Sequence, residues 1–498
     1  MEKLCYETLK KIGNQDYVKK TAPERVLQFG EGNFLRAFVD YFLDVANEEG
    51  SFDGKVVLVQ PIEMGLTDLV NSQDGLYTLY LRGSEHGQKV DDRRLISCVS
   101  RCIDPYRDFD ALLRCAENPD LEIIVSNTTE AGIVYDPACR FEDRPQSSFP
   151  GKLTRLLYQR FLAFGGAKEK QPVILSCELI DNNGKELKQC VLRYIAQWAL
   201  PEAFREWTEE CVFCSTLVDR IVPGRIRDPK QLALLEQANG YHDDLIDVGE
   251  CFGVWIIEGP AWLEDKLPFR KAGLNVHVVP DVTPYKKRKV RILNGAHTSM
   301  VLGAYLAGLD IVRDCMYDPV IRGFMNKLLY EEVIPTLSLP KEDLKAFAAS
   351  VQDRFANPFV DHKLLTISLN STSKWHARCM PSFLDYVNQE KKMPSCLTVS
   401  MAAYIAFYSC DIQRREENAL ICRRPAGDEY AVMDDSWVLD FYMDHRADSA
   451  EALTDAVLGN TRMWGQDLRE IPGFAAAVCA ALKTIRQDGA KQAFAQCL

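Results

Sequence analysis

The sequence lacks any long hydrophobic run. No stretch approaches the roughly 20 consecutive apolar residues that a membrane-spanning helix requires. The opening residues, MEKLCYETLKKIG, also lack the apolar core of a signal peptide. These absences predict a cytoplasmic protein without a membrane partner.

A surplus of positive charge is also missing. The chain of 498 residues carries 59 Lys and Arg against 71 Asp and Glu, a net charge of −12. A nucleic-acid surface needs a basic face, so we expect no nucleic-acid partner. The hydrophobic content of 47% and the charged content of 26% are typical of a globular protein of two or three domains.

A recognisable metal-ligand set is absent from the sequence. Histidine is scarce, at 7 residues, and the 17 cysteines are scattered. The pair Cys211 and Cys214 has the spacing of half a zinc site, but no second pair accompanies it. We therefore predict reduced thiols and no metal.

The third glycine of the dinucleotide-binding fingerprint is lacking as well. Val26–Phe29 is expected to be a strand, and Gly30 and Gly32 follow it at the start of a helix. Backbone N–H groups in such a turn can hold a pyrophosphate. Position 35, where the fingerprint has glycine, is Leu35, so a tight turn without a ligand is an equal alternative.

The acidic residue that usually closes the second strand of an NAD-binding domain is also missing. Residues 55–60 are expected to form that strand, which ends in Gln60 and Pro61, with Glu63 shortly after. The residues alone therefore leave the choice between NAD and NADP open.

Further apolar strands alternate with amphipathic helices up to residue 280. Residues 121–125 and 173–177 are expected strands, and small polar residues follow the first of them at 126–132. Ligands bind beyond the carboxyl ends of parallel strands, although a capped turn would also explain such residues. We predict an α/β fold with a Rossmann-type doubly wound domain over 1–280.

Helical patterns dominate from residue 281 onwards. We predict a mainly α-helical substrate and catalytic domain over 281–498, with the active site between the two domains. The polar stretch 411–432 is expected to be a surface loop.

The stretch 281–308 carries the most useful set of polar residues. Thr283 and Pro284 predict the start of a helix, and Gly308 predicts its end. A regular α-helix advances about 100° per residue, so Lys289, Asn294 and His297 could face one cleft. A lysine can exchange a proton once its pKa is lowered, an amide can donate to an alkoxide, and an imidazole can orient a hydroxyl. A solvated basic face and a satisfied core histidine are the alternatives.

Besides the set on this helix, a second and a third group of residues have open interpretations. Asp219 and Arg220 lie within an apolar run, which indicates either a structural ion pair or the wall of an active site. A third set consists of basic side chains in the helical half, which could hold an anionic small molecule or be scattered surface charge. These are His362, Lys363, Lys374 and Arg378.

Three motifs together resemble the mannitol dehydrogenase family of polyol-specific long-chain dehydrogenases. The set Lys-x4-Asn-x2-His is matched by Lys289, Asn294 and His297. The turn G-x-G-x-F-x-R is matched at 30–36, and V-D-R-I-x-P at 218–223. The resemblance, which runs from about residue 22 to the C-terminus, also explains the missing third glycine.

The resemblance implies an NAD-dependent oxidoreductase that transfers hydride without a metal. It places the cofactor against two loops, whose expected contact residues are Phe29, Gly30, Gly32, Asn33, Phe34, Arg36, Asn127, Thr128 and Glu130. It makes Lys289, Asn294 and His297 catalytic, and it implies that Asp219 and Lys374 line the substrate pocket. We add Arg220, Asn183, His362, Lys363 and Arg378 as expected substrate contacts.

The sequences of several segments, such as SNTTEAGI and CELIDNNG, most resemble those of family members that act on sugar acids. This implies interconversion of D-altronate and D-tagaturonate in hexuronate catabolism. Leu179 stands where mannitol-type members have an oxyanion-binding asparagine, and Asn182 or Asn183 could substitute for it. The alternatives are fructuronate reduction to mannonate, a mannitol-type polyol dehydrogenase, a non-catalytic nucleotide sensor, or a zinc enzyme.

Overall fold

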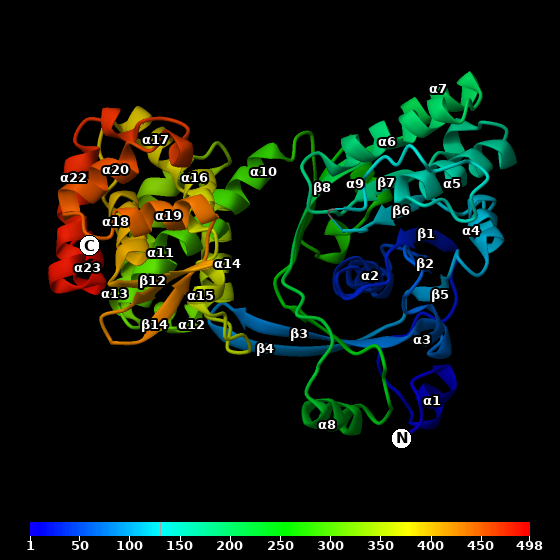
Figure 1. Ribbon diagram of the computed structural model, residues 1–498. Coiled ribbons are helices and arrows are strands. Elements are labelled where there is room, and N and C mark those ends of the chain that lie inside the picture. The colour runs from blue at the N-terminus through cyan, green and yellow to red at the C-terminus, as the bar shows by residue number, and fades with distance from the viewer. Residues whose placement is uncertain (130) are drawn as a thin grey trace. The chain divides into compact units, whose positions relative to one another are not determined.

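The structure is a computed structural model, in which residues 1–129 and 131–498 are described (Figure 1). The chain separates into two compact units. The first comprises Met1–Arg82 and Val90–Val282, and the second comprises Gly83–Lys89 and Thr283–Leu498.

An eight-stranded sheet forms the centre of the first unit. Its strand order is β11-β10-β8-β7-β6-β1-β2-β5, and neighbouring strands run parallel except β8 and β10. The strands are β1 (Glu24–Phe29), β2 (Lys55–Val59), β5 (Val99–Ile103), β6 (Ile123–Ser126), β7 (Val173–Ser176), β8 (Phe213–Asp219), β10 (Val254–Glu258) and β11 (Val276–Val279).

The order of the strands reverses at β1. From β1 the chain first builds outwards through β2 and β5, and then returns to build β6, β7 and β8 on the other side. Phe29 at the end of β1 is paired with Ser126 at the end of β6. The loops that follow these two strands therefore start side by side, at the type of switch point where doubly wound sheets bind ligands.

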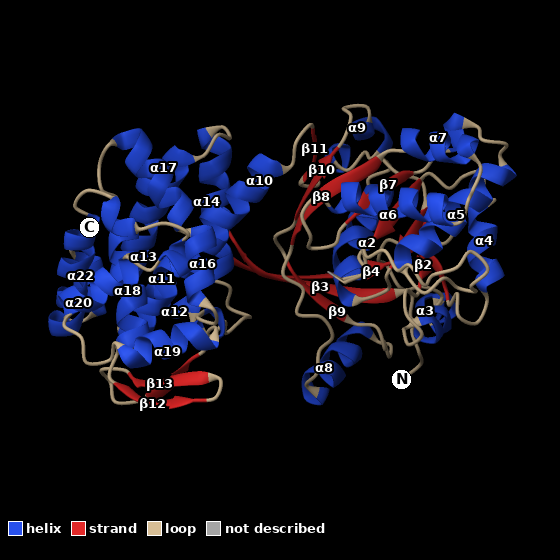
Figure 2. Cartoon of the chain, turned by 45° about the horizontal axis from the view of Figure 1, so that its top comes forward, coloured by secondary structure: helices blue, strands red, loops and turns tan. Residues whose placement is uncertain are grey.

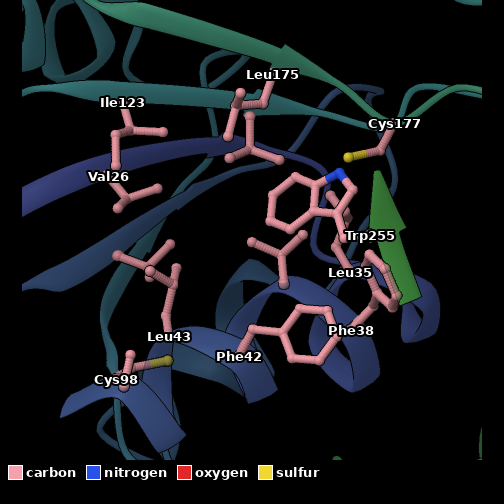
Figure 3. Close-up of a cluster of buried hydrophobic side chains, with 14 of the residues drawn as sticks. Val26, Leu35, Phe38, Phe42, Leu43, Cys98, Ile123, Leu175, Cys177 and Trp255 are labelled. Carbon is pink, nitrogen blue, oxygen red and sulfur yellow. The ribbon is translucent and has the colours of Figure 1, made fainter. Parts of the chain in front are cut away.

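Helices cover both faces of this sheet. On one face, α2 (Asn33–Glu48) packs its apolar side against the strands, and Phe38 and Phe42 lie 5.7 and 6.4 Å from the ring of Trp255 (Figure 3). On the other face lie α4 (Phe109–Ala116), α5 (Phe149–Ala163), α6 (Asn183–Gln197) and α7 (Glu202–Glu210). The remaining helical segments are α1 (Tyr6–Lys11), α3 (Thr67–Ser72), η1 (Lys168–Lys170), α8 (Pro229–Asn239), α9 (Leu263–Lys266) and η2 (Arg270–Ala272).

A second sheet carries a long hairpin. Its order is β4-β3-β9, with β3 (Tyr77–Glu85), β4 (Gln88–Ile96) and β9 (Asp247–Glu250). The tip of the hairpin belongs to the second unit, where the Asp353 carboxylate accepts hydrogen bonds from the N–H groups of His86 and Gly87 at 2.9 and 3.2 Å.

The second unit is mainly α-helical (Figure 2). Nearly every residue of α11 (Gly295–Leu306) and α18 (Ser395–Ser409) is buried, and these two helices pack against each other in the core. Around them lie α10 (Thr283–Arg288), η3 (Lys289–Asn294), α12 (Val312–Tyr317), α13 (Pro319–Lys327), η4 (Leu328–Val333), η5 (Ile334–Thr336), α14 (Lys341–Phe355), α15 (Leu364–Ile367), α16 (Ser371–Arg378), α17 (Met380–Glu390), α19 (Ser436–Asp444), α20 (Ala450–Leu458), α21 (Thr461–Trp464), η6 (Leu468–Glu470), α22 (Phe474–Asp488) and α23 (Ala490–Ala495).

The expectation of a loop over 411–432 is wrong. This stretch forms a three-stranded antiparallel sheet of β12 (Ile412–Glu416), β13 (Ala419–Arg423) and β14 (Glu429–Val432). Residues 419–422 and alternate residues of β14 are buried, while charged side chains occupy exposed positions. Strands β13 and β14 each bury only a few apolar residues. The many charged residues on the exposed face made the sequence resemble a polar loop.

The predicted α/β fold class is confirmed, because a Rossmann-type parallel sheet and a helical region are both present. Within the described residues, no helix combines the length and apolar character needed to cross a membrane.

Helix α2 carries a buried acidic group. Asp40 is fully buried and accepts a hydrogen bond of 2.9 Å from the Tyr77 hydroxyl. Burial raises the pKa of Asp40 to about 7 and contributes most to raising the pKa of Asp247 to about 6. The pKa of Asp40 is higher in the folded state than its ordinary value of 3.8. Between pH 3.8 and about 7, the folded protein therefore binds more protons than the unfolded chain. Stability therefore falls as pH rises towards 7.

We expect Asp40→Asn to reduce this loss of stability, because asparagine keeps the bond to Tyr77 without titrating. Urea unfolding at pH 5 and pH 8 should show a smaller difference in the free energy of unfolding for the variant than for the parent. Asp92→Asn, at an exposed position, is the control. An unchanged pH dependence in Asp40→Asn would contradict this assignment.

Candidate active site

The turn after β1 requires glycine at its first position. Gly30 has a φ of 127°, and a Cβ placed there would lie 3.0 Å from Leu35 Cδ1 and 3.2 Å from the carbonyl oxygen of Asn127. Only glycine adopts this backbone conformation without strain. Leu35 itself is 2% exposed and packs into the core, which is the structural reason that the third glycine is absent.

Gly32 differs from Gly30 because space is open around it. It is exposed, and a Cβ at Gly32 would meet no atom of the described chain within 4 Å. Gly32 is the N-cap of α2, which has no acidic residue in its first turn and no capping side chain among the described residues. The first N–H groups of this helix are therefore available to an anion such as a pyrophosphate.

Three of the expected cofactor residues support the turn from inside. Arg36 is completely buried, and it donates to the Glu31 carbonyl at 3.1 Å, the Leu245 carbonyl at 2.6 Å and Asn33 Oδ1 at 2.8 Å. Phe29 is also fully buried. Phe34 stacks on Phe38, with 5.2 Å between ring centroids. The positions of Arg36 and Phe29 indicate that they shape the turn rather than touch a ligand.

The loop after β6 is held by a residue that the sequence interpretation did not select. The carboxylate of Glu178 accepts hydrogen bonds from the Thr128 N–H at 3.0 Å, the Thr128 hydroxyl at 3.1 Å and the Ser126 hydroxyl at 3.2 Å. Glu178 is 2% exposed, and its burial raises its pKa. An acid directly after the predicted strand 173–177 was the available signal. The expected contact Glu130 lies outside the described residues.

Asn183, an expected substrate residue of the first unit, already uses its side-chain amide in hydrogen bonds within that unit. The amide of Asn183 donates to the carbonyls of Ser176 and Glu178, each at 2.9 Å, and its Oδ1 accepts from the N–H of Thr216 at 2.9 Å. It therefore has little hydrogen-bonding capacity left for an oxyanion. Leu179, in contrast, is 66% exposed, and Asn182 beside it is exposed.

Arg220 is likewise used within the first unit. It is 7% exposed and donates to the carbonyls of Ala37 at 2.6 Å and Phe252 at 3.0 Å, and its guanidinium lies over Tyr41 at 4.7 Å. Asp219, the last residue of β8, is 4% exposed. Arg220 therefore acts as a structural residue at this position.

In the second unit, Lys289 and Asn294 lie on a π-helical turn, where the sequence predicted one regular α-helix. Lys289–Asn294 form η3 between α10 and α11, and the Gly295 N–H donates to the carbonyl of Val290, five residues earlier. A turn closed after five residues brings Asn294 back to the side of Lys289, instead of about 140° away. His297 follows three α-helical residues later, about 60° from Asn294.

Asn294 and His297 both have unused hydrogen-bonding groups. The side chain of Asn294 is half-buried and has no hydrogen-bond partner among the described residues. His297 Nε2 is buried and also lacks a partner within the described chain. The imidazole stacks on Phe355, with centroids 4.0 Å apart, and meets the ring of His362 edge-on at 5.5 Å.

Positive groups surround His297. Burial, followed by the charges of His362, Arg354, Arg378 and Lys374, lowers its pKa well below the usual value of 6.5. The imidazole is therefore neutral at physiological pH, with one nitrogen that donates and one that accepts. Arg354 was not selected from the sequence, although it lies in the polar segment RFANPF.

Lys374 and Arg378 lie one turn apart on α16, and each has a neutral partner. Lys374 Nζ donates to the Ile367 carbonyl at 2.8 Å, and Arg378 Nη1 donates to the Thr298 hydroxyl at 3.3 Å. Neither forms an ion pair with a described residue, and burial lowers the pKa of both. Two adjacent cations repel each other, so an anion placed between them would be stabilised. Lys363, in contrast, is exposed.

The described residues contain no group of three or more His, Cys, Asp or Glu placed to hold a metal ion.

The two glycines of the turn should respond differently to alanine. Gly30→Ala should lower the melting temperature, because φ is positive and the Asn127 carbonyl is close. Gly32→Ala should fold normally and weaken dinucleotide binding about tenfold or more, because its Cβ would occupy the space of the pyrophosphate. Differential scanning fluorimetry and fluorescence titration with NADH measure the two effects. Normal binding by Gly32→Ala would contradict this location of the dinucleotide.

Known proteins resemble this chain over almost its whole length. Residues 24–271 match the mannitol dehydrogenase Rossmann domain, and residues 281–486 match the mannitol dehydrogenase C-terminal domain. Altronate oxidoreductases of Shigella flexneri and Escherichia coli are each 44% identical over 493 residues, covering 97% of this chain and 99% of theirs.

Two solved structures share the fold. A D-sorbitol dehydrogenase in substrate-free form is 23% identical with a TM-score of 0.79, covering 99% of this chain and 100% of its own. Mannitol 2-dehydrogenase of Pseudomonas fluorescens, solved with NAD and D-mannitol, is 21% identical with a TM-score of 0.63, covering 99% of each chain. The chain therefore belongs to the mannitol dehydrogenase family and is a dehydrogenase.

Proposed function

We propose that this dehydrogenase interconverts D-altronate and D-tagaturonate with NAD(H), without a metal, in the cytoplasmic breakdown of hexuronates. The observation that carries the sugar-acid substrate is the pair of cations Lys374 and Arg378, which lack an acidic partner among the described residues and lie near the neutral His297. The names of the relatives at 44% identity support altronate as the particular acid.

NAD, when bound, accepts the hydride from the alcohol carbon during oxidation and returns it during reduction. Its pyrophosphate fits the open surface at Gly32 and the uncapped N-terminus of α2. The loop at Asn127 and Thr128, held by Glu178, supports the rest of the dinucleotide.

Lys289, Asn294 and His297 have three different roles in the proposed reaction. Lys289 takes the hydroxyl proton of the alcohol during oxidation and returns it to the oxyanion during reduction. Asn294 donates its free amide N–H to that oxygen, and the neutral His297 holds a neighbouring hydroxyl. Asp219 lines the pocket. The exposed Asn182 is a better substitute for the missing oxyanion asparagine than the saturated Asn183.

The substrate carboxylate binds between Lys374 and Arg378, with His362 beside them. This interaction favours hexonates over neutral polyols, because a polyol would leave two partly buried cations without an anion.

The substrate is tested by following NADH absorbance with tagaturonate, fructuronate and fructose, each with and without EDTA. We expect selective oxidation of NADH by tagaturonate that EDTA does not change. Equal or faster turnover of fructuronate or fructose would overturn the choice of substrate.

Replacement of Lys289 by alanine tests the assignment of the base. Turnover should fall by about 10²–10⁴-fold, because a positioned proton-transfer group is lost. The Kd for NADH, measured by fluorescence, should stay nearly the same. Turnover close to that of the parent enzyme would show that another group transfers the proton.

The carboxylate site is tested by Arg378→Met, with Lys363→Met as a matched control in an exposed cation. Arg378→Met should lower kcat/KM for tagaturonate by about 10–100-fold, as expected for one charge-assisted hydrogen bond. Any turnover of fructose should change much less, and Lys363→Met should leave both values unchanged. An equal loss for tagaturonate and fructose would indicate a structural role for Arg378 instead.

A further inference from the structure

In a Rossmann fold, the loop that follows the second strand binds the adenosine ribose of the dinucleotide. Gln60, the first residue after β2, is not available for this contact. In the Rossmann fold, a carboxylate near this position accepts the ribose hydroxyls of NAD. Here Gln60 follows β2, and its amide donates to the carbonyls of Ile62 at 2.8 Å and Glu63 at 3.1 Å. Its Oε1 accepts from the Thr67 hydroxyl at 2.9 Å. Gln60 is therefore fully used in holding the loop that follows it.

A carboxylate reaches the same place from another loop. Glu31 lies between Gly30 and Gly32, and its Oε1 accepts a hydrogen bond of 3.3 Å from the Leu66 N–H. A side chain at Gly65 would overlap Glu31 Oε1 and the Gln60 side chain, so the loop after β2 closes directly on Glu31. Glu31 is 6% exposed and forms no ion pair with a described residue.

Charges of both signs act on Glu31. Arg36 favours the ionised carboxylate, but it is fully buried and already donates to three oxygen atoms of the first unit. Asp104, just beyond β5, is 7% exposed and close enough to contribute to raising the pKa of Glu31, although burial is the larger cause. The nearby cation Arg107 is held by two acids, with Nη1 2.8 Å from Asp68 and Nε 3.1 Å from Asp104. A 2′-phosphate, with about two negative charges at neutral pH, would meet Glu31 and Asp104, while Arg36 and Arg107, the cations named here among the described residues, are both engaged by other groups.

We propose that Glu31 is the residue that selects NAD over NADP, because it accepts the ribose hydroxyls in place of the usual acid after β2 and repels a 2′-phosphate. This inference rests on the use of a nicotinamide dinucleotide. It is independent of the sugar substrate, because it concerns binding of the cofactor alone.

The test is the ratio of the Kd values for NADPH and NADH, measured by fluorescence titration without a sugar. The parent enzyme should bind NADH more tightly by about 100-fold or more, and Glu31→Gln should lower this ratio at least about tenfold. The matched control is Glu63→Gln, which removes the same charge from an exposed position in the neighbouring loop and should leave the ratio within about twofold.

A second variant keeps the test decisive if Glu31→Gln does not fold. Asp68 is exposed, and Asp68→Asn should release Arg107 from one of its two acids and allow it to approach a 2′-phosphate. The ratio should then fall about threefold or more, through tighter binding of NADPH. An unchanged ratio in folded Glu31→Gln, an equal change in Glu63→Gln, or tighter binding of NADPH by the parent enzyme would each overturn the proposal. If Glu31→Gln does not fold, an unchanged ratio in Asp68→Asn would overturn it.

Discussion

The close approach of two loops at the strand-order switch is the constraint on which the first unit depends. The Gly30 N–H donates to the Val59 carbonyl at 3.0 Å, and the Asn127 N–H donates to the Phe29 carbonyl at 3.1 Å. These bonds fix the turn after β1 against both neighbouring strands, and a Cβ at position 30 would lie only 3.2 Å from the Asn127 carbonyl oxygen. The buried Arg36 stabilises the same turn by donating a hydrogen bond to the Glu31 carbonyl. A rigid backbone surface at the N-terminus of α2 is the result, and such a surface suits a pyrophosphate.

In the second unit, the polar side chains of Asn294 and His297 lie within a helical core and keep hydrogen-bonding groups unused among the described residues. A regular α-helix would place Asn294 far round from Lys289, whereas the π-helical turn returns it to the same side. His297 stacks on Phe355, and burial, followed by the neighbouring positive groups, lowers the pKa of its imidazole. The local surroundings therefore set the protonation state of His297, and the backbone sets its direction.

The two groups of residues proposed to bind ligands differ in the sign of their charge. Uncompensated carboxylates, such as Glu31 and Glu178, border the dinucleotide loops of the first unit. Cations with neutral partners gather near His297 in the second. Buried charges are costly unless they are paired or used, and this cost is the physical basis of the two binding proposals. An uncharged ribose suits the first set, and a carboxylate suits the second.

The sequence by itself determined the fold class and the family, because apolar strands with glycine-rich turns and three ordered motifs are local features. It also placed the start of α10 at Thr283. It did not determine the π-helical turn, the sheet at 412–432, or the roles of Glu31 and Glu178, and the predicted catalytic roles remain predictions. Only the tertiary structure decided which polar side chains are saturated, as Asn183 and Arg220 are, and which keep a free group, as Asn294 does. The reason is that hydrogen bonds between distant segments consume donors and acceptors, and no local pattern records which partners they find.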